Sequence, residues 1–223
     1  MKDLKFLSRH IDVSAVKTEI SMQEIDQMIS TVKKYNCICA SPMPWATRYT
    51  IDKLKDTTGT VTTGVVSFPA GAETTFIKEA TTKELIAMGC EEIDMVMNVS
   101  AFLSGDYEYV KKDIQRVIAA ANGVPVKVIL EIAYLTDEQI RRAAAIGVES
   151  GATFIKTGTG WGPKPTTIHT IEIIKEEIGN SAKIKAAGGI RDLDSLLAMY
   201  EAGCDRFGLG VKTVEKILKD LFR

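Results

Sequence analysis

Short runs of β-branched and other apolar residues alternate with longer amphipathic segments along the whole chain, and this alternation most restricts its fold. The pattern is typical of a parallel sheet whose strands are joined by helical crossovers. Eight parallel strands are the number that closes a barrel. We predict eight strands, near residues 9–12, 37–41, 60–68, 93–99, 126–132, 153–157, 183–187 and 205–209.

The segments between these runs carry helix start and stop signals. Ser21 is followed three residues later by Glu24, and Thr136 by Gln139, which is the spacing of a capping box. Helices are expected to end at glycines that adopt a left-handed conformation, namely Gly89, Gly123, Gly147 or Gly151, Gly179 and Gly203. We therefore predict an α/β fold, a (β/α)8 TIM barrel forming a single domain over residues 1–223. A doubly wound open sheet is the alternative, because a strand count from sequence is uncertain by about one element.

Composition excludes several classes of protein. A chain of 223 residues that is 45% hydrophobic can bury one core, and its net charge of -1 and pI near 6.2 provide no basic surface for nucleic acid or a polybasic membrane anchor. No segment approaches the roughly 18 uninterrupted apolar residues of a membrane span. We expect a soluble cytoplasmic protein without nucleic-acid or membrane partners.

Neither the cysteines nor the histidines have the spacing of a metal site. Cys37, Cys39, Cys90 and Cys204 match neither a CxxC pattern nor a disulfide framework, so we expect them to be reduced and mostly buried. His10 and His169 are far apart in sequence and lack the spacing of a ligand cluster. We expect no metal and no other cofactor.

Three predicted strands carry ionisable residues at alternating positions, in residues 92–98, 154–160 and 183–189. If the apolar residues on either side of Asp94 face the helices, Asp94 faces the barrel axis. The same alternation points Lys156 and Lys185 inward. In such barrels the chemistry lies at the carboxyl ends of the strands, so the three side chains are expected to meet there.

Two buried lysines beside one aspartate favour amine chemistry. Burial disfavours a charged lysine, and a second cation nearby lowers its pKa further, which leaves a neutral amine able to attack a carbonyl. Asp94 can hold the second lysine charged and can accept or donate a proton. The alternative is a buried ion-pair network of Lys156, Lys185 and Asp94 without a catalytic role.

Glycines directly after the two lysine strands predict an anion site. Thr157, Gly158 and Gly160 follow Lys156, and Gly188 and Gly189 follow Lys185. Main-chain amides at such strand-to-helix turns bind anions, and the loops after strands seven and eight of these barrels often hold phosphate. Arg191 adds positive charge to the same region.

With these residues in view, the chain resembles the deoxyribose-phosphate aldolase family over almost its whole length. The matching motifs, in order, are residues 92–98, 126–131, 154–160 and 184–191. The resemblance implies a class I aldolase that reversibly cleaves 2-deoxy-D-ribose 5-phosphate to D-glyceraldehyde 3-phosphate and acetaldehyde, without a metal. It also implies Lys156 as the Schiff-base lysine, Lys185 as the lysine that assists it and Asp94 as the proton-transfer acid. Asp12 and Cys39 correspond to the family's first-strand aspartate and second-strand cysteine, and the family inclines us to a homodimer.

The chain departs from the family pattern where phosphate is bound. Residues 208–213 read GLGVKT in place of a Gly-Thr-Ser-Ser run, so Gly208 and Gly210 keep their amides while Lys212 can supply charge in place of two hydroxyls. Ser14 can stand in for a first-strand threonine. Trp45 either lines a substrate pocket or, as is commoner at a helix start, packs. Two further hypotheses stay open: a Schiff-base aldolase with a different aldehyde or sugar phosphate, and a non-catalytic ligand-binding barrel.

Overall fold

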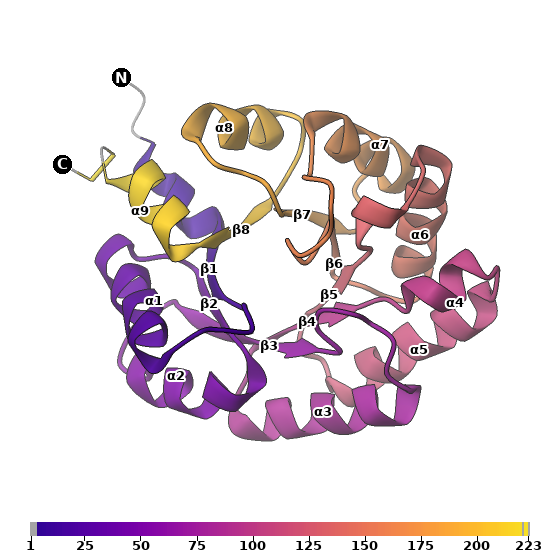
Figure 1. Ribbon diagram of the computed structural model, residues 1–223, viewed down its shortest axis with the longest axis horizontal. Coiled ribbons are helices and arrows are strands. Elements are labelled where there is room, and N and C mark those ends of the chain that lie inside the picture. Colours follow the sequence, from indigo (N-terminus) through magenta and orange to yellow (C-terminus); the bar gives the residue numbers. More distant parts are fainter. Residues whose placement is uncertain (1–3, 220, 223) are drawn as a thin grey trace.

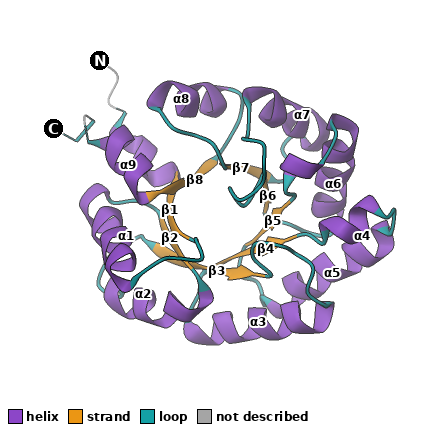
Figure 2. Ribbon diagram, in the orientation of Figure 1, coloured by secondary structure: helices purple, strands orange, loops and turns teal. Residues whose placement is uncertain are grey.

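Eight parallel strands close into a barrel in which each strand pairs with its neighbours in sequence order and β8 pairs with β1 (Figure 2). This computed structural model describes residues 4–219 and 221–222. The closed barrel confirms the predicted fold and excludes the open sheet. The strands are β1 Ile11–Ala15, β2 Cys39–Pro42, β3 Val61–Val66, β4 Glu92–Val96, β5 Val126–Ile129, β6 Phe154–Lys156, β7 Lys183–Ala187 and β8 Arg206–Gly210.

Helices form a ring around the barrel and cover the outer face of its strands (Figure 1). They are α1 Met22–Tyr35, α2 Thr47–Leu54, α3 Thr75–Met88, α4 Val99–Leu103, α5 Tyr107–Ala120, α6 Asp137–Glu149, α7 Ile168–Ile178, α8 Leu193–Glu201 and α9 Val211–Leu218. Three short 3₁₀ helices are added in the described chain, η1 Lys5–His10, η2 Pro44–Ala46 and η3 Ile132–Tyr134. No helix among the described residues is long and apolar enough to cross a membrane.

The predicted helix boundaries depend on capping residues that the structure confirms. Ser21 and Thr136 each form a capping box with the residue three positions later. Of the two glycines proposed near the end of α6, Gly151 has the positive φ of 95°. Gly147 instead lies inside α6, where an added Cβ would approach Ile155 Cδ1 to 2.6 Å. A side chain there would require the end of the buried Ile155 side chain, or α6 itself, to shift.

The first strand begins later than predicted. Arg9 and His10, which we expected in the strand, end the 3₁₀ helix η1, and β1 starts at Ile11. Arg9 donates to the carbonyls of Asn36 and Gly59, and the His10 ring pairs with the carbonyl of Asp205. Asn36, Gly59 and Asp205 precede β2, β3 and β8, so these contacts tie the segment to the amino ends of other strands in place of strand pairing.

Strand alternation divides the interior into an apolar and a polar region. Ile93 and Met95 point toward the helices and are fully buried in the hydrophobic core between barrel and helices. Asp94 between them points to the axis, as predicted, where its carboxylate meets lysines of other strands. The four cysteines are free and buried. The sheet thus has one apolar face and, inside the barrel, a layer of charges.

Candidate active site

A cavity of about 400 Å³ opens at the carboxyl ends of the strands, and Lys156, Lys185 and Asp94 lie on its wall. They come from β6, β7 and β4. Sequence reasoning predicted that these side chains would meet, and the structure brings them together. The site therefore combines a solvent-accessible space with two amines and a carboxylate.

Asp94 connects both lysines. Its Oδ2 accepts from Lys156 Nζ at 2.7 Å and from Lys185 Nζ at 2.8 Å, while its Oδ1 accepts from Lys127 Nζ at 2.7 Å. Thr63 on β3 adds a hydroxyl donor to Oδ1 at 3.1 Å. All four bonds are buried, so the carboxylate is fixed and both lysine amines are fixed relative to each other.

A second layer of charges lies beneath the first. Lys185 Nζ is 2.5 Å from Asp12 Oδ2, and Asp12 also pairs with Arg206 at 2.8 Å. Glu92 pairs with Lys127 at 2.5 Å and with Arg206 at 3.4 Å. These pairs come from five strands, and they anchor the two layers to each other through Lys127 and Lys185.

The interior charges balance only if one amine is neutral. Three carboxylates (Asp12, Glu92 and Asp94) face four basic groups (Lys127, Lys156, Lys185 and Arg206). Lys127 is paired with three carboxylates, and Lys185 and Arg206 with two each. Lys156 is paired with one, Asp94, which it shares. Among these bases Lys156 is the one whose neutral form gives up the fewest ion pairs, so it is the base that this low-dielectric interior most readily leaves uncharged.

The pKa shifts have the same physical causes. Burial, together with the charge of Lys185 and against the attraction of Asp94, lowers the pKa of Lys156 to about 8. Burial also opposes the charge on Lys185, but Asp12 and Asp94 outweigh it and raise the pKa of Lys185 above its ordinary value. Although burial favours a protonated Asp94, the three lysines hold its pKa well below the usual range. One amine is thus tuned toward its free base beside a cation and an ionised carboxylate.

Most of the predicted anion-binding residues lie on the cavity wall. They are Gly160, Gly188, Gly189, Arg191, Gly208, Gly210 and Lys212. Strand β8 runs directly into α9, whose N-cap Gly210 has no side chain to bind the first amides of the helix. Lys17 also lines the cavity, on the same side as Lys212. Hydrogen bonds from Ser21, and to a smaller extent the charges of Lys17 and Lys212, lower the pKa of Glu24 nearby, so this side of the cavity gathers several cations.

Four residues that we predicted to contact the substrate do not line the cavity. Asp12 and Cys39 are neighbours in register and fully buried in the lower layer, where Asp12 binds Lys185 and Arg206. The Thr157 hydroxyl donates to the carbonyl of Ala187, which ties β6 to β7. Gly158 lies over Glu131, which an added Cβ would approach to 3.0 Å. These four residues support the wall from behind.

The loop after β6 bends inward over the barrel mouth (Figure 1). Glu131, in a left-handed conformation with φ 56°, accepts hydrogen bonds from the Thr159 hydroxyl and, at 3.3 Å, from its amide. Trp161 Nε1 donates to the carbonyl of Val16 at 2.9 Å, and its ring meets Phe68 edge-on at 6.1 Å. Trp161 therefore connects the loops after β1, β3 and β6 across the cavity. Trp45, by contrast, is 61% exposed and does not line it.

Sequence reasoning missed part of the charged interior. Lys127 lies between two apolar residues of β5, so the alternation that pointed Lys156 inward also points Lys127 inward. Arg206 and Glu92 begin strands, and only their partners across the barrel show that they face inward. Trp161 gave a weaker signal, as an aromatic between two glycines.

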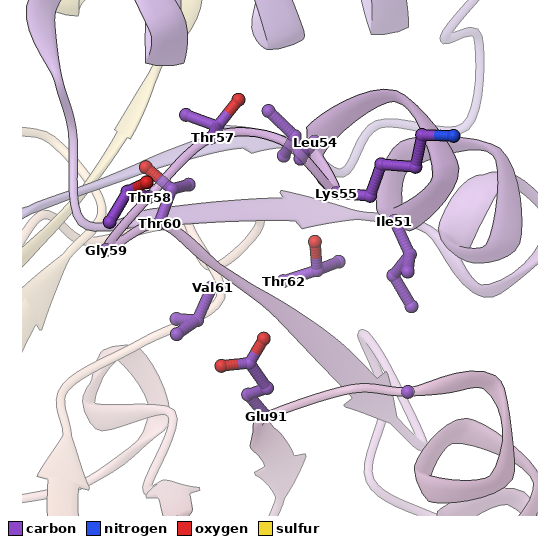
Figure 3. A pocket seen from close by; sticks show the side chains of 11 residues that line it. Ile51, Leu54, Lys55, Thr57, Thr58, Gly59, Thr60, Val61, Thr62 and Glu91 are labelled. Carbon is purple, nitrogen blue, oxygen red and sulfur yellow. The ribbon is translucent and has the colours of Figure 1, made fainter.

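A second cavity, of about 330 Å³, is shown in Figure 3. Residues at the amino ends of β3 and β4 line it, so it lies at the end of the barrel opposite to the first cavity. Its walls come from the end of α2, from the segments that lead into β3 and β4, and from the first residues of β3, and they include Lys55, Glu91 and Thr62. Neither catalytic lysine candidate reaches it. Both lysines line the cavity at the carboxyl ends of the strands instead.

One group of described side chains lies close enough together to be considered as a metal site. Oxygen atoms of Asp12 and Glu92 and the sulfur of Cys39 lie within 4.8 Å of one another. Both carboxylates are already paired with Lys127 and Arg206, and burial raises the pKa of the Cys39 thiol well above its ordinary value. A cation would have to displace fixed cations and bind a protonated thiol, so these residues fit an ion-pair network better than a metal.

Comparison with known protein families gives a match over most of the chain. The family model described as "DeoC/LacD family aldolase" matches residues 6–210. A deoxyribose-phosphate aldolase of Klebsiella pneumoniae is 41% identical over 216 residues, which cover 96% of this chain and 87% of the relative. The deoxyribose-phosphate aldolase of Rhizobium meliloti is 38% identical over 213 residues, with 96% and 86% covered.

Solved structures agree with the barrel. A protein described as "QR15, an Aldolase" superposes with a TM-score of 0.89 at 31% identity, covering 99% of this chain and 96% of the other. A deoxyribose phosphate aldolase from Aeropyrum pernix, described as a unique tetrameric structure, has a TM-score of 0.87 at 24% identity, covering 97% of this chain and 91% of that one. The latter likeness supports the fold alone.

Proposed function

The chain belongs to the DeoC/LacD family of aldolases, and from this premise we propose that it reversibly cleaves 2-deoxy-D-ribose 5-phosphate to D-glyceraldehyde 3-phosphate and acetaldehyde through an imine on Lys156. Family membership makes the protein a carbon–carbon lyase and rules against a non-catalytic barrel. The observation that carries the choice of nucleophile is the position of Lys156, which lies on the cavity wall and has the fewest carboxylate partners of the four interior bases.

Formation of the imine needs a neutral amine and a nearby proton acceptor. Lys156 Nζ attacks C1 of the open-chain sugar, and the proton that the nitrogen loses passes to Asp94 Oδ2, 2.7 Å away in the free protein. Asp94 returns this proton to the oxygen of the adduct, which gives a carbinolamine, and a second proton from water in the cavity lets this oxygen leave as water, so that a protonated imine (iminium) remains. Because its pKa is held low, Asp94 releases a proton readily once it has received one.

Cleavage then breaks the bond between C2 and C3. The C3 hydroxyl gives its proton to Asp94 through water, the C2–C3 electron pair moves into the iminium to form an enamine, and D-glyceraldehyde 3-phosphate leaves. Asp94 passes the proton that it received through water to C2 of the enamine. Water then hydrolyses the resulting iminium to acetaldehyde and free Lys156, and one proton returns to the solvent. Lys185, held charged by Asp12 and Asp94, keeps a positive charge beside the reacting nitrogen throughout.

We assign the substrate phosphate to the part of the cavity wall that carries Lys17, Arg191 and Lys212, called the cation rim below. The first amides of α9 and the turn at Gly188 and Gly189 supply donors, and Lys212 and Arg191 supply charge. The same rim supports the narrower alternative of an aldolase for another aldehyde or sugar phosphate, because the β8–α9 turn carries a lysine where hydroxyls would discriminate more sharply. Thr157 and Gly158, with Asp12 and Cys39, support this wall and the lysines from behind.

Turnover of 2-deoxyribose 5-phosphate, compared with unphosphorylated 2-deoxyribose, tests the proposal. We expect a clear preference for the phosphate and a loss of about a thousandfold or more in kcat for Lys156→Met. Asp94→Asn should lower kcat by about 10²–10⁴-fold while still allowing some imine to form. Lys83→Met, at an exposed surface ion pair, is the matched control and should keep full activity. No turnover of either sugar by the unaltered protein would refute the proposed reaction.

The assembly and the compartment belong to the same proposal. We expect a homodimer in the cytoplasm, with a sugar phosphate and an aldehyde as small-molecule ligands. Light scattering of the purified protein measures the assembly directly, and a mass other than that of a dimer would contradict this part.

A further inference from the structure

Ser41 on β2 has a feature that the mechanism above does not use. Its side chain is 4% exposed, and its Oγ is the buried side-chain polar atom without a hydrogen-bond partner among residues 4–219 and 221–222. A buried hydroxyl without a partner costs about 1–3 kcal/mol, so native structures seldom keep one without a reason. Ser41 also lines the cavity that contains Lys156.

Strand register places Ser41 beside the proposed phosphate site. Ser14 on β1 pairs with Ser41 on one side and with Gly210 on the other. Gly210 is the N-cap of α9, and all three residues line the cavity. Adjacent strands are about 4.8 Å apart, so Ser41 lies roughly 10 Å across the wall from the start of α9. This is the span of a short phosphorylated carbon chain.

Ser41 is also separate from the reacting amine. Its hydroxyl makes no hydrogen bond to Lys156, Lys185 or Asp94, although these charged groups would be its strongest partners. Strands β2 and β6 lie on opposite sides of the closed barrel (Figure 2). A ligand group that meets Ser41 is therefore a polar group of the substrate away from the imine carbon and nearer the phosphate.

We infer that Ser41 is a specificity-determining residue that binds the C4 hydroxyl of 2-deoxyribose 5-phosphate, which is the 2-hydroxyl of D-glyceraldehyde 3-phosphate. This inference rests on the proposed function. The C4 carbon lies between the bond that breaks and the phosphate, so its hydroxyl is the substrate group expected at the level of Ser14 and Gly210. An aldehyde without that hydroxyl leaves Ser41 unpaired, as it is in the free protein, and therefore lacks the hydrogen bond that favours binding of the hydroxylated aldehyde.

The test is aldol synthesis from acetaldehyde with two acceptors, D-glyceraldehyde 3-phosphate and 3-oxopropyl phosphate, which lacks the 2-hydroxyl. The unaltered protein should favour the hydroxylated acceptor in kcat/KM by about tenfold, the effect of one hydrogen bond. Ser41→Ala should remove most of this preference, mainly by lowering kcat/KM for the hydroxylated acceptor. Ser41→Thr, which keeps a hydroxyl, should retain part of it.

Ser150→Ala provides the matched control, because Ser150 is a buried serine whose hydroxyl donates to the carbonyl of Ile146 at 2.7 Å, away from the cavity. It should lower the thermal unfolding midpoint and leave the acceptor ratio unchanged. Ser41→Ala should not lower the midpoint, since it removes an unpaired hydroxyl. Equal losses for both acceptors, an unchanged ratio, or a destabilised Ser41→Ala protein would overturn the inference. Failure of the unaltered protein to use either acceptor would instead refute the proposed function, and the inference with it.

Discussion

Lys156 and Lys185 differ in chemistry because they differ in carboxylate partners. Lys185 lies between Asp12 and Asp94, whereas Lys156 shares Asp94 alone. Burial acts on both amines, but only for Lys156 does it outweigh the nearby negative charge. The positions of two aspartates thus give two identical side chains on neighbouring strands different pKa values, and this difference supports the proposed roles of Lys156 as nucleophile and Lys185 as fixed cation.

A pH profile of kcat/KM for 2-deoxyribose 5-phosphate cleavage measures this division. Only the neutral amine attacks, and its pKa is lowered to about 8, so kcat/KM should rise with pH up to about 8 and level off above it. Below that pH the rate should fall about tenfold per pH unit. Lys185→Met removes the charge that lowers the pKa of Lys156, so the rise should move to higher pH. Lys185→Arg keeps the charge, so its profile should stay close to that of the unaltered protein. A profile that is the same in all three proteins would contradict this account.

At the scale of elements, the start of α9 and the loop after β6 form two sides of the substrate cavity. Helix α9 presents an uncapped N-terminus and Lys212 to the cavity, and the loop is held in place by Glu131. The first is proposed to bind charge, and the second to shape the opening. Each role can be tested without changing Lys156 or Lys185.

Lys212→Ala should raise the KM for 2-deoxyribose 5-phosphate by about tenfold, because it removes a charge-assisted contact with the phosphate. The KM for unphosphorylated 2-deoxyribose should stay the same. Lys219→Ala, at the other end of the same helix, is the control and should alter neither. If both sugars lose affinity equally, Lys212 has a structural role instead.

Glu131→Ala should loosen the loop that carries Thr159 and Trp161. The fluorescence of Trp161, recorded in a Trp45→Phe background, should shift to the red as the indole leaves the carbonyl of Val16 and the edge of Phe68. The KM should rise with it, by a few-fold or more. Glu131→Gln retains one acceptor oxygen, so its emission and its KM should lie between those of the unaltered protein and those of Glu131→Ala. An unchanged emission spectrum in Glu131→Ala would show that other contacts hold the loop.

Alternation within strands made much of the site predictable. The apolar neighbours of Asp94, Lys156 and Lys185 assigned their direction, and the strand order brought them together. Lys127 obeys the same rule but has no glycine loop after it that would have drawn attention to it. Ser41 and Glu131 could not be found this way. The missing hydrogen-bond partner of the Ser41 hydroxyl and the left-handed backbone conformation of Glu131 both depend on packing between segments far apart in the sequence. The start of β1 was missed because the contacts of Arg9 with Asn36 and Gly59 are also tertiary.

For the molecule as a whole, the barrel interior is a balanced set of charges instead of an apolar core. Lys127 contributes most pairs, with Asp12, Glu92 and Asp94 all within 4 Å of its amine. That the 223 residues form one domain around this interior stays a prediction. The charge balance has a direct consequence for stability.

Lys127→Met should lower the free energy of unfolding by about 3–5 kcal/mol, because it removes a cation that Asp12, Glu92 and Asp94 share in the buried interior. Urea denaturation measures the change. Adding Glu92→Gln to that variant removes one of the uncompensated charges and should recover part of the loss. Lys34→Met, at an exposed ion pair, should change stability by less than about 1 kcal/mol. A double variant no more stable than Lys127→Met would contradict charge balance as the organising feature.

The imine on Lys156 can be tested directly by reduction with borohydride in the presence of acetaldehyde, followed by peptide mass spectrometry. The account predicts one added ethyl group per chain, located on Lys156, and none in the Lys156→Met protein. An unmodified Lys156, or an ethyl group found on Lys185 or Lys127 instead, would contradict it.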